Sequence, residues 1–327
     1  MEIPYLEYFG LNERPFGLTP DANFYFESQT HKEALEHLRF FLMQKEGLAC
    51  IYGDVGLGKT VLSRLFIDSL NKNIYNTALI LNPIMDDKEF LQEVLTELGI
   101  PYDNNLSKKD MFSRLEGFLL EEYKKGKETI IVIDEAQLIS DETFEFIRIL
   151  SNLETDKEKI LHIILFGQQE LIERLKQPHM RYISQRISVI YRLRPLNFNE
   201  INLYITHRLL KAGSKGFVQF EDNAIPLIYN ASKGYPRTIN IICDRCLIAL
   251  YSKSGRSVND KIVKSVLKDE SLGPFIEKKE KTFFNKKGIY ILVTVFVLLL
   301  ILLIILSIFN IIPVKDIFKD IFKLKGG

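Results

Sequence analysis

Short apolar runs alternate with longer segments of helical periodicity over the first 195 residues of the chain. The runs are five or six residues long, contain many β-branched side chains and end near polar residues or glycine. Such runs are typical of strands buried on both faces of a parallel sheet, with helices between them. The pattern therefore predicts an α/β domain over residues 1–195, with a five-stranded, mostly parallel sheet and helices on both faces. The expected strands are Leu48–Tyr52, Thr77–Leu81, Thr129–Ile133, Leu161–Phe166 and Ser188–Leu193.

The strand signals stop at Pro195, and the segment that follows is helical in its periodicity. Apolar positions recur with helical spacing from Asn199 to Lys268, interrupted by glycines that are typical of helix ends. We therefore expect a small helical lid domain over residues 196–272, helical throughout. Its predicted helices are Glu200–Ala212, Asp222–Ser232, Pro236–Tyr251 and Asn259–Leu267.

A long apolar segment lies near the end of the printed sequence. Ile289–Ile312 contains no charged residue, and as a helix it would span about 36 Å at roughly 1.5 Å per residue. The hydrocarbon core of a bilayer is about 30 Å thick, so this segment predicts one transmembrane helix. A basic linker, residues 273–288, is expected before it, and a short amphipathic tail, residues 313–327, after it.

The composition is that of a globular protein with room for two domains: of 327 residues, 46% are apolar and 26% are charged. The formal net charge is +1, but residues 277–327 carry nine lysines and four acids, which leaves 34 basic and 38 acidic residues before them. This slightly acidic body gives no global electrostatic case for nucleic-acid binding. Cys243 and Cys246 fall in an apolar helical pattern, so we expect core cysteines rather than a zinc site.

The most specific chemical motif follows the first predicted strand. Residues 53–60 fit the pattern G-x-x-x-x-G-K-[ST] between an apolar run and a helical pattern. Glycines in such a loop let backbone N–H groups face phosphates, and the next helix adds its positive N-terminal end. Lys59 is expected to reach the β- and γ-phosphates of a nucleoside triphosphate, and Thr60 to bind Mg²⁺. The loop consists of Gly53, Asp54, Val55, Gly56, Leu57, Gly58, Lys59 and Thr60.

Two acids follow the third predicted strand, in the form of a Walker B element. Asp134 and Glu135 come directly after the apolar residues Ile130–Ile133. Because the carboxyl ends of parallel strands line the ligand crevice, Asp134 is expected to face the Mg²⁺ held by Thr60. Glu135 is expected to take a proton from the attacking water or to orient that water.

Four other residues are candidates for contacts with the γ-phosphate. Gln168 follows the fourth predicted strand, where its side chain could lie between the phosphate and Glu135; the alternative is a helix-starting turn without ligand contact. Arg181 and Arg186 precede the last strand and could enter a neighbouring subunit's site, or they are ordinary surface arginines. Arg237 lies in a first helical turn, where the helix dipole disfavours a cation, so we expect it to contact a phosphate.

Taken in order, these motifs resemble the AAA+ ATPases and, among them, the ExeA/GspA group of secretion-associated ATPases, over roughly residues 1–270. Further shared positions occur near the N-terminus, around the acidic motif and in the helical segment. They include Tyr8–Leu11, Pro15, Phe16, Thr19–Asp21, His31, Asp134–Gln137, Gln185–Ile187, His207–Leu209 and the Gly-x-Pro-Arg of Gly234–Arg237 with Asn240.

The resemblance implies ATP and Mg²⁺ as ligands and ATP hydrolysis as the activity. It implies that Gln168 is the sensor-1 residue, Arg237 the sensor-2 residue and Arg186 the arginine finger, with Arg181 as second choice. A finger supplied in trans also implies a homo-oligomer. The aromatic segment Phe9–Phe26 is expected near the adenine or, alternatively, as plain packing.

The resemblance also implies a location and a partner class. Because ATP is cytosolic, residues 1–287 are expected on the cytoplasmic side of a bacterial inner membrane, with one C-terminal crossing. Members of the group continue into a periplasmic domain that engages peptidoglycan, whereas the printed sequence ends at Gly327, so that role is not expected. The expected function is ATP-driven or ATP-licensed assembly of a secretion, pilus or exopolysaccharide export apparatus. The alternatives are a DNA-binding regulator of the transposition type and a slow nucleotide-gated scaffold.

Overall fold

The computed structural model describes residues 3–103, 105–154 and 158–269, and the single positions 294, 297, 298, 301 and 302. The chain divides into two compact units, Met1–Ile276 and Glu277–Gly327. The first unit contains the sheet, the helical segment and all the candidate site residues.

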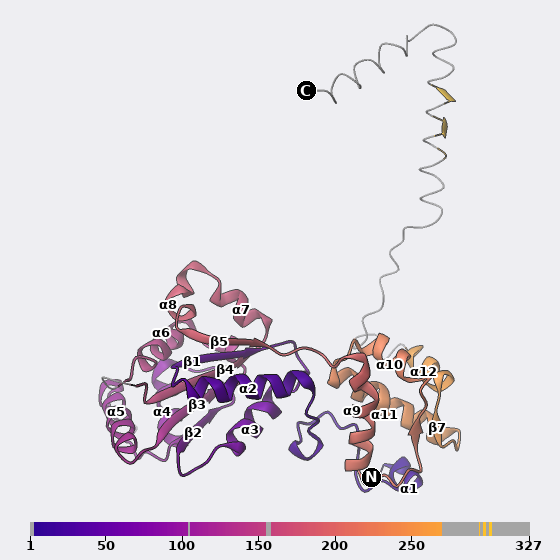
Figure 1. Cartoon of the computed structure of the whole chain (residues 1–327), viewed down its shortest axis with the longest axis horizontal. Helices are drawn as coiled ribbons and strands as arrows, with labels where there is room; N and C mark the ends of the chain where they lie inside the picture. Colours follow the sequence, from indigo (N-terminus) through magenta and orange to yellow (C-terminus); the bar gives the residue numbers. More distant parts are fainter. Residues whose placement is uncertain are drawn as a thin grey trace. The chain divides into compact units, whose positions relative to one another are not determined.

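A five-stranded sheet in the order β2-β3-β4-β1-β5 forms the centre of the α/β part, and every neighbouring pair is parallel (Figure 1). This confirms the predicted α/β class, and each strand lies within two residues of its predicted bounds. The strands are β1 (Leu48–Tyr52), β2 (Tyr75–Ile80), β3 (Glu128–Ile133), β4 (Leu161–Gly167) and β5 (Ile187–Arg192).

Alternating residues of the central strands enter two separate cores on the two sides of the sheet. Ala49 and Ile51 pack with α2 (Gln29–Met43) and α3 (Lys59–Ser69) on one side. Leu48 and Cys50 pack on the other side, against a core built largely from the remaining helices of this part. The near-continuous apolar runs follow from this double burial, because a strand covered on both faces has no solvent-facing position. The helices of the second side are α4 (Asp87–Glu97), α5 (Lys108–Lys124), α6 (Asp141–Leu150), α7 (Gln169–Leu175) and α8 (Arg181–Ser184).

The strand order places three functional loops at one edge of the sheet. β4 pairs with β1 on one side and with β3 on the other, so the carboxyl ends of β3, β4 and β1 are neighbours. The phosphate-binding loop, the acidic motif and Gln168 follow these three strands. Segments more than 100 residues apart in the sequence therefore meet at this edge, as the crevice rule for open α/β sheets requires.

The helical segment contains the four predicted helices and one feature that the sequence did not indicate. Residues Gln219–Phe220 (β6) and Ser257–Val258 (β7) form a small parallel ladder, so the prediction that the segment is helical throughout was wrong. Each strand has only two residues, too few for any alternation to be visible in the sequence. The helices are α9 (Phe198–Lys211), α10 (Ile225–Ser232), α11 (Pro236–Ser252) and α12 (Asp260–Leu267).

The N-terminal segment packs on the helical part and not on the sheet. Phe9 and Phe16 are fully buried in one core with the lid residues Ile239 and Cys243. The Tyr5 hydroxyl donates to Asp244 at 2.7 Å, across 239 positions of sequence. By its packing, this segment therefore belongs with the helical part, although a continuous boundary of 1–195 was expected. It contains α1 (Pro4–Phe9) and the 3-10 turn η1 (Ala22–Phe24); two other such turns are η2 (Ala136–Leu138) and η3 (Pro178–Met180).

The predicted transmembrane segment, Ile289–Ile312, lies outside the described residues except at five positions, which are helical. Within the described residues, no helix combines the length and apolar composition needed to cross a bilayer. The linker predicted at residues 273–288 and the tail predicted at residues 313–327 lie entirely outside the described residues.

Candidate nucleotide-binding site

The loop between β1 and α3 has a backbone path that requires glycine at several positions. Gly56 and Gly58 have φ values of +83° and +88°, in the left-handed region that glycine adopts without strain. A Cβ atom at Gly53 would lie 2.9 Å from the carbonyl oxygen of Leu193. Helix α3 begins at Lys59, so its N-terminal amides lie directly behind the loop. This is the arrangement in which a loop and a helix end bind phosphate.

Lys59 is buried, with 6% of its surface exposed, and its ammonium group is held by the loop itself. Nζ donates to the carbonyl oxygens of Gly53, at 2.7 Å, and of Asp54, at 3.0 Å. Burial lowers the pKa of Lys59, and the negative charges of Glu135 and Asp134 act in the opposite direction. The two carbonyl groups are neutral, so the charge of Lys59 remains available to a phosphate.

Thr60 and Asp134 are joined by a hydrogen bond across the crevice. Thr60 Oγ1 donates to Asp134 Oδ2 at 2.5 Å, and Asp134 is 1% exposed. Burial raises the pKa of Asp134, while the bonds from Thr60 and from the Glu135 amide lower it. A hydroxyl and a carboxylate so placed fit Mg²⁺, which takes few protein ligands and completes its shell with phosphate oxygens and water. In the described residues no group of three or more His, Cys, Asp or Glu side chains could hold a metal ion by itself.

Glu135 is held by two glutamines from neighbouring segments. Its Oε2 accepts from Gln168 Nε2 at 2.9 Å and also from Gln137 Nε2. Gln137 Oε1 in turn accepts the backbone N–H of Gln168 at 3.0 Å, so each of the three residues is hydrogen-bonded to the other two. Glu135 has a φ of +49°, a conformation that costs a non-glycine residue about 1 kcal/mol. The surrounding bonds maintain this conformation at the end of β3.

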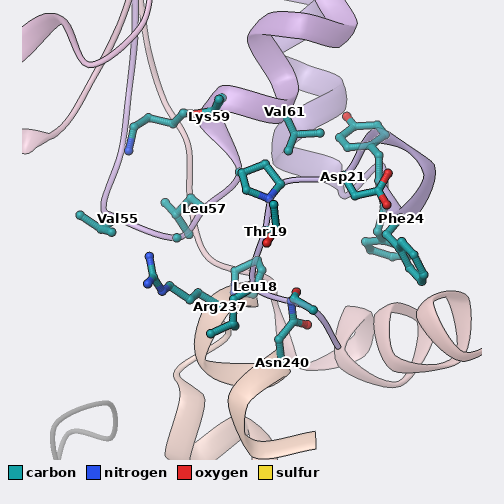
Figure 2. Close-up of a pocket in the computed structure, with 18 of the residues that line it drawn as sticks. Leu18, Thr19, Asp21, Phe24, Val55, Leu57, Lys59, Val61, Arg237 and Asn240 are labelled. Carbon is teal, nitrogen blue, oxygen red and sulfur yellow. The ribbon is translucent and has the colours of Figure 1, made fainter. Parts of the chain in front are cut away.

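A pocket of about 250 Å³ joins the phosphate-binding loop to the helical part. Lys59, Thr60, Glu135 and Gln168 contribute to it from the sheet side. Figure 2 shows Lys59 and Val61 on that side and Arg237 and Asn240 on the helical side. Beside them lie four N-terminal residues, Leu18, Thr19, Asp21 and Phe24. The part of the aromatic segment that follows Phe16 therefore lines this pocket, whereas Phe9 and Phe16 are core residues.

The helical part reaches the loop through two residues of one turn. Tyr235 Oη donates to Asp54 Oδ2 at 2.7 Å. Arg237 packs over Gly56, where an added Cβ would lie 2.8 Å from Arg237 Cβ. Arg237 is exposed and lines the pocket, and it makes no hydrogen bond or ion pair with any residue that the structure describes. Its charge thus faces the place that the sequence assigned to a phosphate.

The structure does not bring Arg181 or Arg186 to this pocket. Both are exposed, at the start of α8 and immediately before β5, and Arg181 lines a separate surface hollow with Ile187 and Ile190. Neither side chain has a hydrogen bond or salt bridge to the described parts of the chain. Within one chain they are surface arginines, and the finger assignment stays a prediction that needs a neighbouring subunit.

Three residues of the site were not assigned a role from the sequence. Gln137 orients Glu135, Tyr235 bonds to Asp54, and His31 contacts the carbonyl of Leu57. Gln137 lies two positions after Glu135 and Tyr235 two positions before Arg237, so proximity to a motif was an available signal. His31 lies in a helix before the first strand, and only its place among the family-like positions pointed to it.

Comparisons with known proteins agree with this site. A family model described as an AAA domain matches residues 42–175, which include the loop, the acidic motif and Gln168. The chain is 36% identical over 254 residues to General secretion pathway protein A of Aeromonas hydrophila. This alignment covers 78% of the present chain and 46% of that relative, so the chain spans about half the relative's length.

Solved structures share the fold at low sequence identity. The ORC2 protein of Aeropyrum pernix is 16% identical with a TM-score of 0.57, over 79% of this chain and 72% of that one. Cdc6p of Pyrobaculum aerophilum is 16% identical with a TM-score of 0.56, over 76% and 71%. These likenesses establish the fold alone, whereas the sequence match confirms the expected resemblance. The chain belongs to the AAA+ ATPase family and, within it, is a relative of General secretion pathway protein A.

Proposed function

We propose that the chain binds ATP with Mg²⁺ and hydrolyses it. The observation that carries this proposal is the bond of Gln168 to Glu135, beside the bonded pair of Thr60 and Asp134. A site that only held a nucleotide would need the loop and Lys59 but no carboxylate oriented by two amides. Glu135 is thus a base candidate supported by positioned neighbours, which is the arrangement that proton transfer requires.

Each residue has a distinct part in the proposed reaction. The loop amides and Lys59 bind the phosphates, and Thr60 and Asp134 hold the cation. A bound Mg²⁺ would neutralise charge on the phosphates. Glu135 accepts a proton from the attacking water, and Gln168 fixes the carboxylate while its amide faces the pocket. Arg237 supplies positive charge from the helical side, and Arg186 does so from a neighbouring subunit in an assembled homo-oligomer.

We further propose that this ATPase works at the cytoplasmic face of a bacterial inner membrane. The support is the uncharged segment Ile289–Ile312 and four of its described residues, Val297, Leu298, Ile301 and Leu302, which are helical with 46% to 59% of their surface exposed. The name of the Aeromonas relative refers to general secretion. The proposed role is therefore to drive or license assembly of a secretion, pilus or polysaccharide export apparatus.

The Glu135→Gln variant tests the hydrolytic proposal. It keeps the size of the side chain and its place between two glutamines, but it removes the proton acceptor. We expect ATP turnover to fall by about 100-fold or more, while the affinity for ATP stays within about twofold of the wild type. Glu173→Gln, at an exposed glutamate of α7, makes the same change of charge and should leave turnover unchanged. Normal turnover by the Glu135→Gln variant would exclude this residue as the base.

A further inference from the structure

His31, in the first turn of α2, makes a contact that the phosphate-loop motif does not explain. Its side chain is buried, with 6% of its surface exposed, and it lines the nucleotide pocket. Nε2 lies 2.9 Å from the carbonyl oxygen of Leu57, and Nδ1 lies 2.6 Å from Ser28 Oγ. The motif does not specify the residue at position 57. The carbonyl group of Leu57 is held by His31, a residue outside the loop.

The two partners define the protonation of the ring. A carbonyl oxygen can only accept, so Nε2 must carry the hydrogen that is donated to Leu57. In a neutral ring Nδ1 is then an acceptor, and the Ser28 hydroxyl donates to it. Burial lowers the pKa of His31, which favours this neutral form. His31 is therefore a fixed donor to the loop.

The direction of one carbonyl group determines the direction of the next amide. The chain has no cis peptide bond in its described residues, and in a trans peptide the C=O and the N–H point in opposite directions. A Leu57 carbonyl held toward His31 therefore turns the Gly58 N–H away from His31. Gly58 has a φ of +88°, and a Cβ there would lie 3.4 Å from His31 Nε2, so the ring also limits movement of this peptide.

The surroundings of His31 favour this contact over ordinary helix capping. Ser28 is the N-cap residue of α2, but its side chain bonds to His31 and not to a backbone amide of the helix. The Gln29 amide is bonded instead by Glu200 of α9, at 2.8 Å. The Tyr25 ring packs edge-on against the imidazole, with ring centroids 5.6 Å apart. The ring is thus fixed from three sides by residues of different elements.

We propose that His31 is a positioning residue of the phosphate site, which holds the Leu57–Gly58 peptide so that the Gly58 N–H faces the bound phosphates. The inference rests on the nucleotide binding proposed above. It assigns a residue of α2, outside the loop and outside the acidic motif, to the geometry of the anion-binding amides. The imidazole acts through the loop backbone and needs no contact with the nucleotide.

The test compares two substitutions in the full chain, purified in detergent, with ADP and adenosine as probes. His31→Phe keeps an aromatic ring but removes the donor, whereas His31→Gln keeps an N–H near the position of Nε2. We expect His31→Phe to weaken ADP binding by about tenfold and to leave adenosine binding within about twofold. His31→Gln should recover most of the ADP affinity. Ser28→Ala, which frees the ring to rotate, should give a smaller loss of the same kind.

The outcomes separate this inference from the proposed function. If His31→Phe unfolds at the same temperature as the wild type and binds ADP with the same affinity, the positioning role is wrong. An equal loss for ADP and adenosine would also overturn it, because it would indicate a contact with the nucleoside or general damage to the pocket. If the wild type itself binds ADP no better than adenosine, the proposed nucleotide function fails. Should His31→Phe not fold, the ratio of ADP affinity to adenosine affinity in His31→Gln and Ser28→Ala distinguishes the same outcomes.

Discussion

The acids and the arginines assigned to this site differ in what holds them. Asp134 and Glu135 are each bonded by side chains from other segments, Thr60 for the first and Gln137 and Gln168 for the second. Arg237 and Arg186 have no hydrogen bond or ion pair to any part of the chain that the structure describes. One folded chain thus holds both acids in place, whereas these two arginines have no bonded partner in the part of the chain that the structure describes. In the proposed function, Arg237 meets the charge of a ligand and Arg186 that of a second subunit, while within its own chain the charge of Arg186 also acts on Glu145 and Glu154.

The largest expected effect concerns Arg186, whose proposed partner lies in a second subunit. Arg186→Ala should lower ATP turnover by about 1,000-fold, because the charge that it would supply to a neighbouring site is lost. Mixing this variant with Glu135→Gln should restore part of the turnover, since each supplies what the other lacks. Turnover of the single variants and of the mixture is the measurement. No recovery on mixing, or a larger loss in Arg181→Ala, would contradict the assignment of Arg186.

Lys59→Ala tests a cation that, like the two acids, is already held by its own chain. Removal of a buried cation from the loop should weaken ATP binding by about 100-fold, and turnover should fall with it. Titration with a fluorescent ATP analogue measures the affinity. Lys72→Ala, at an exposed lysine between α3 and β2, is the matched control and should bind as the wild type does. Retained affinity in Lys59→Ala would mean that the loop does not bind phosphate through this residue.

Arg237→Ala is expected to have a smaller effect, because the loop and the cation remain. We expect ATP affinity or turnover to fall by about tenfold. The affinity for ADP, which lacks the γ-phosphate, should fall less. The ratio of the two affinities therefore reports whether Arg237 contacts that phosphate. Lys233→Ala removes an exposed charge near the same helix and serves as the control. Equal losses for ATP and ADP would place the contact elsewhere.

The smallest expected effect concerns the bond between the helical part and the loop. Tyr235→Phe removes the hydroxyl that donates to Asp54, and we expect the free energy of unfolding to fall by about 1 kcal/mol. Urea denaturation of Tyr235→Phe, Asp54→Asn and the double variant gives a cycle that isolates the coupling between the two residues. Fully additive losses would show that the bond does not couple the two parts of the chain.

Local periodicity accounts for most of the elements but not for all of their contacts. The strand β1 has the bounds predicted for it, because four of its five residues are buried and the strand is flanked by charged residues and glycine. The ladder of β6 and β7 was missed because two residues form no pattern. The packing of Tyr5 and Phe9 on the helical part was missed because their partners lie more than 200 positions away. Periodicity shows that a residue is buried but not which core receives it.

The sequence by itself determined the phosphate-binding loop, the paired acids and the alternation of strands and helices. These features depend on neighbouring residues, because a loop of this kind and a strand that ends in two acids are continuous in the chain. Only the tertiary structure decided that Gln137 and Gln168 both bond Glu135, that Tyr235 bonds Asp54, and that His31 holds the Leu57 carbonyl. Those contacts follow from the order of the parallel strands and from the packing of α2 and the helical part around the loop, which no local pattern encodes.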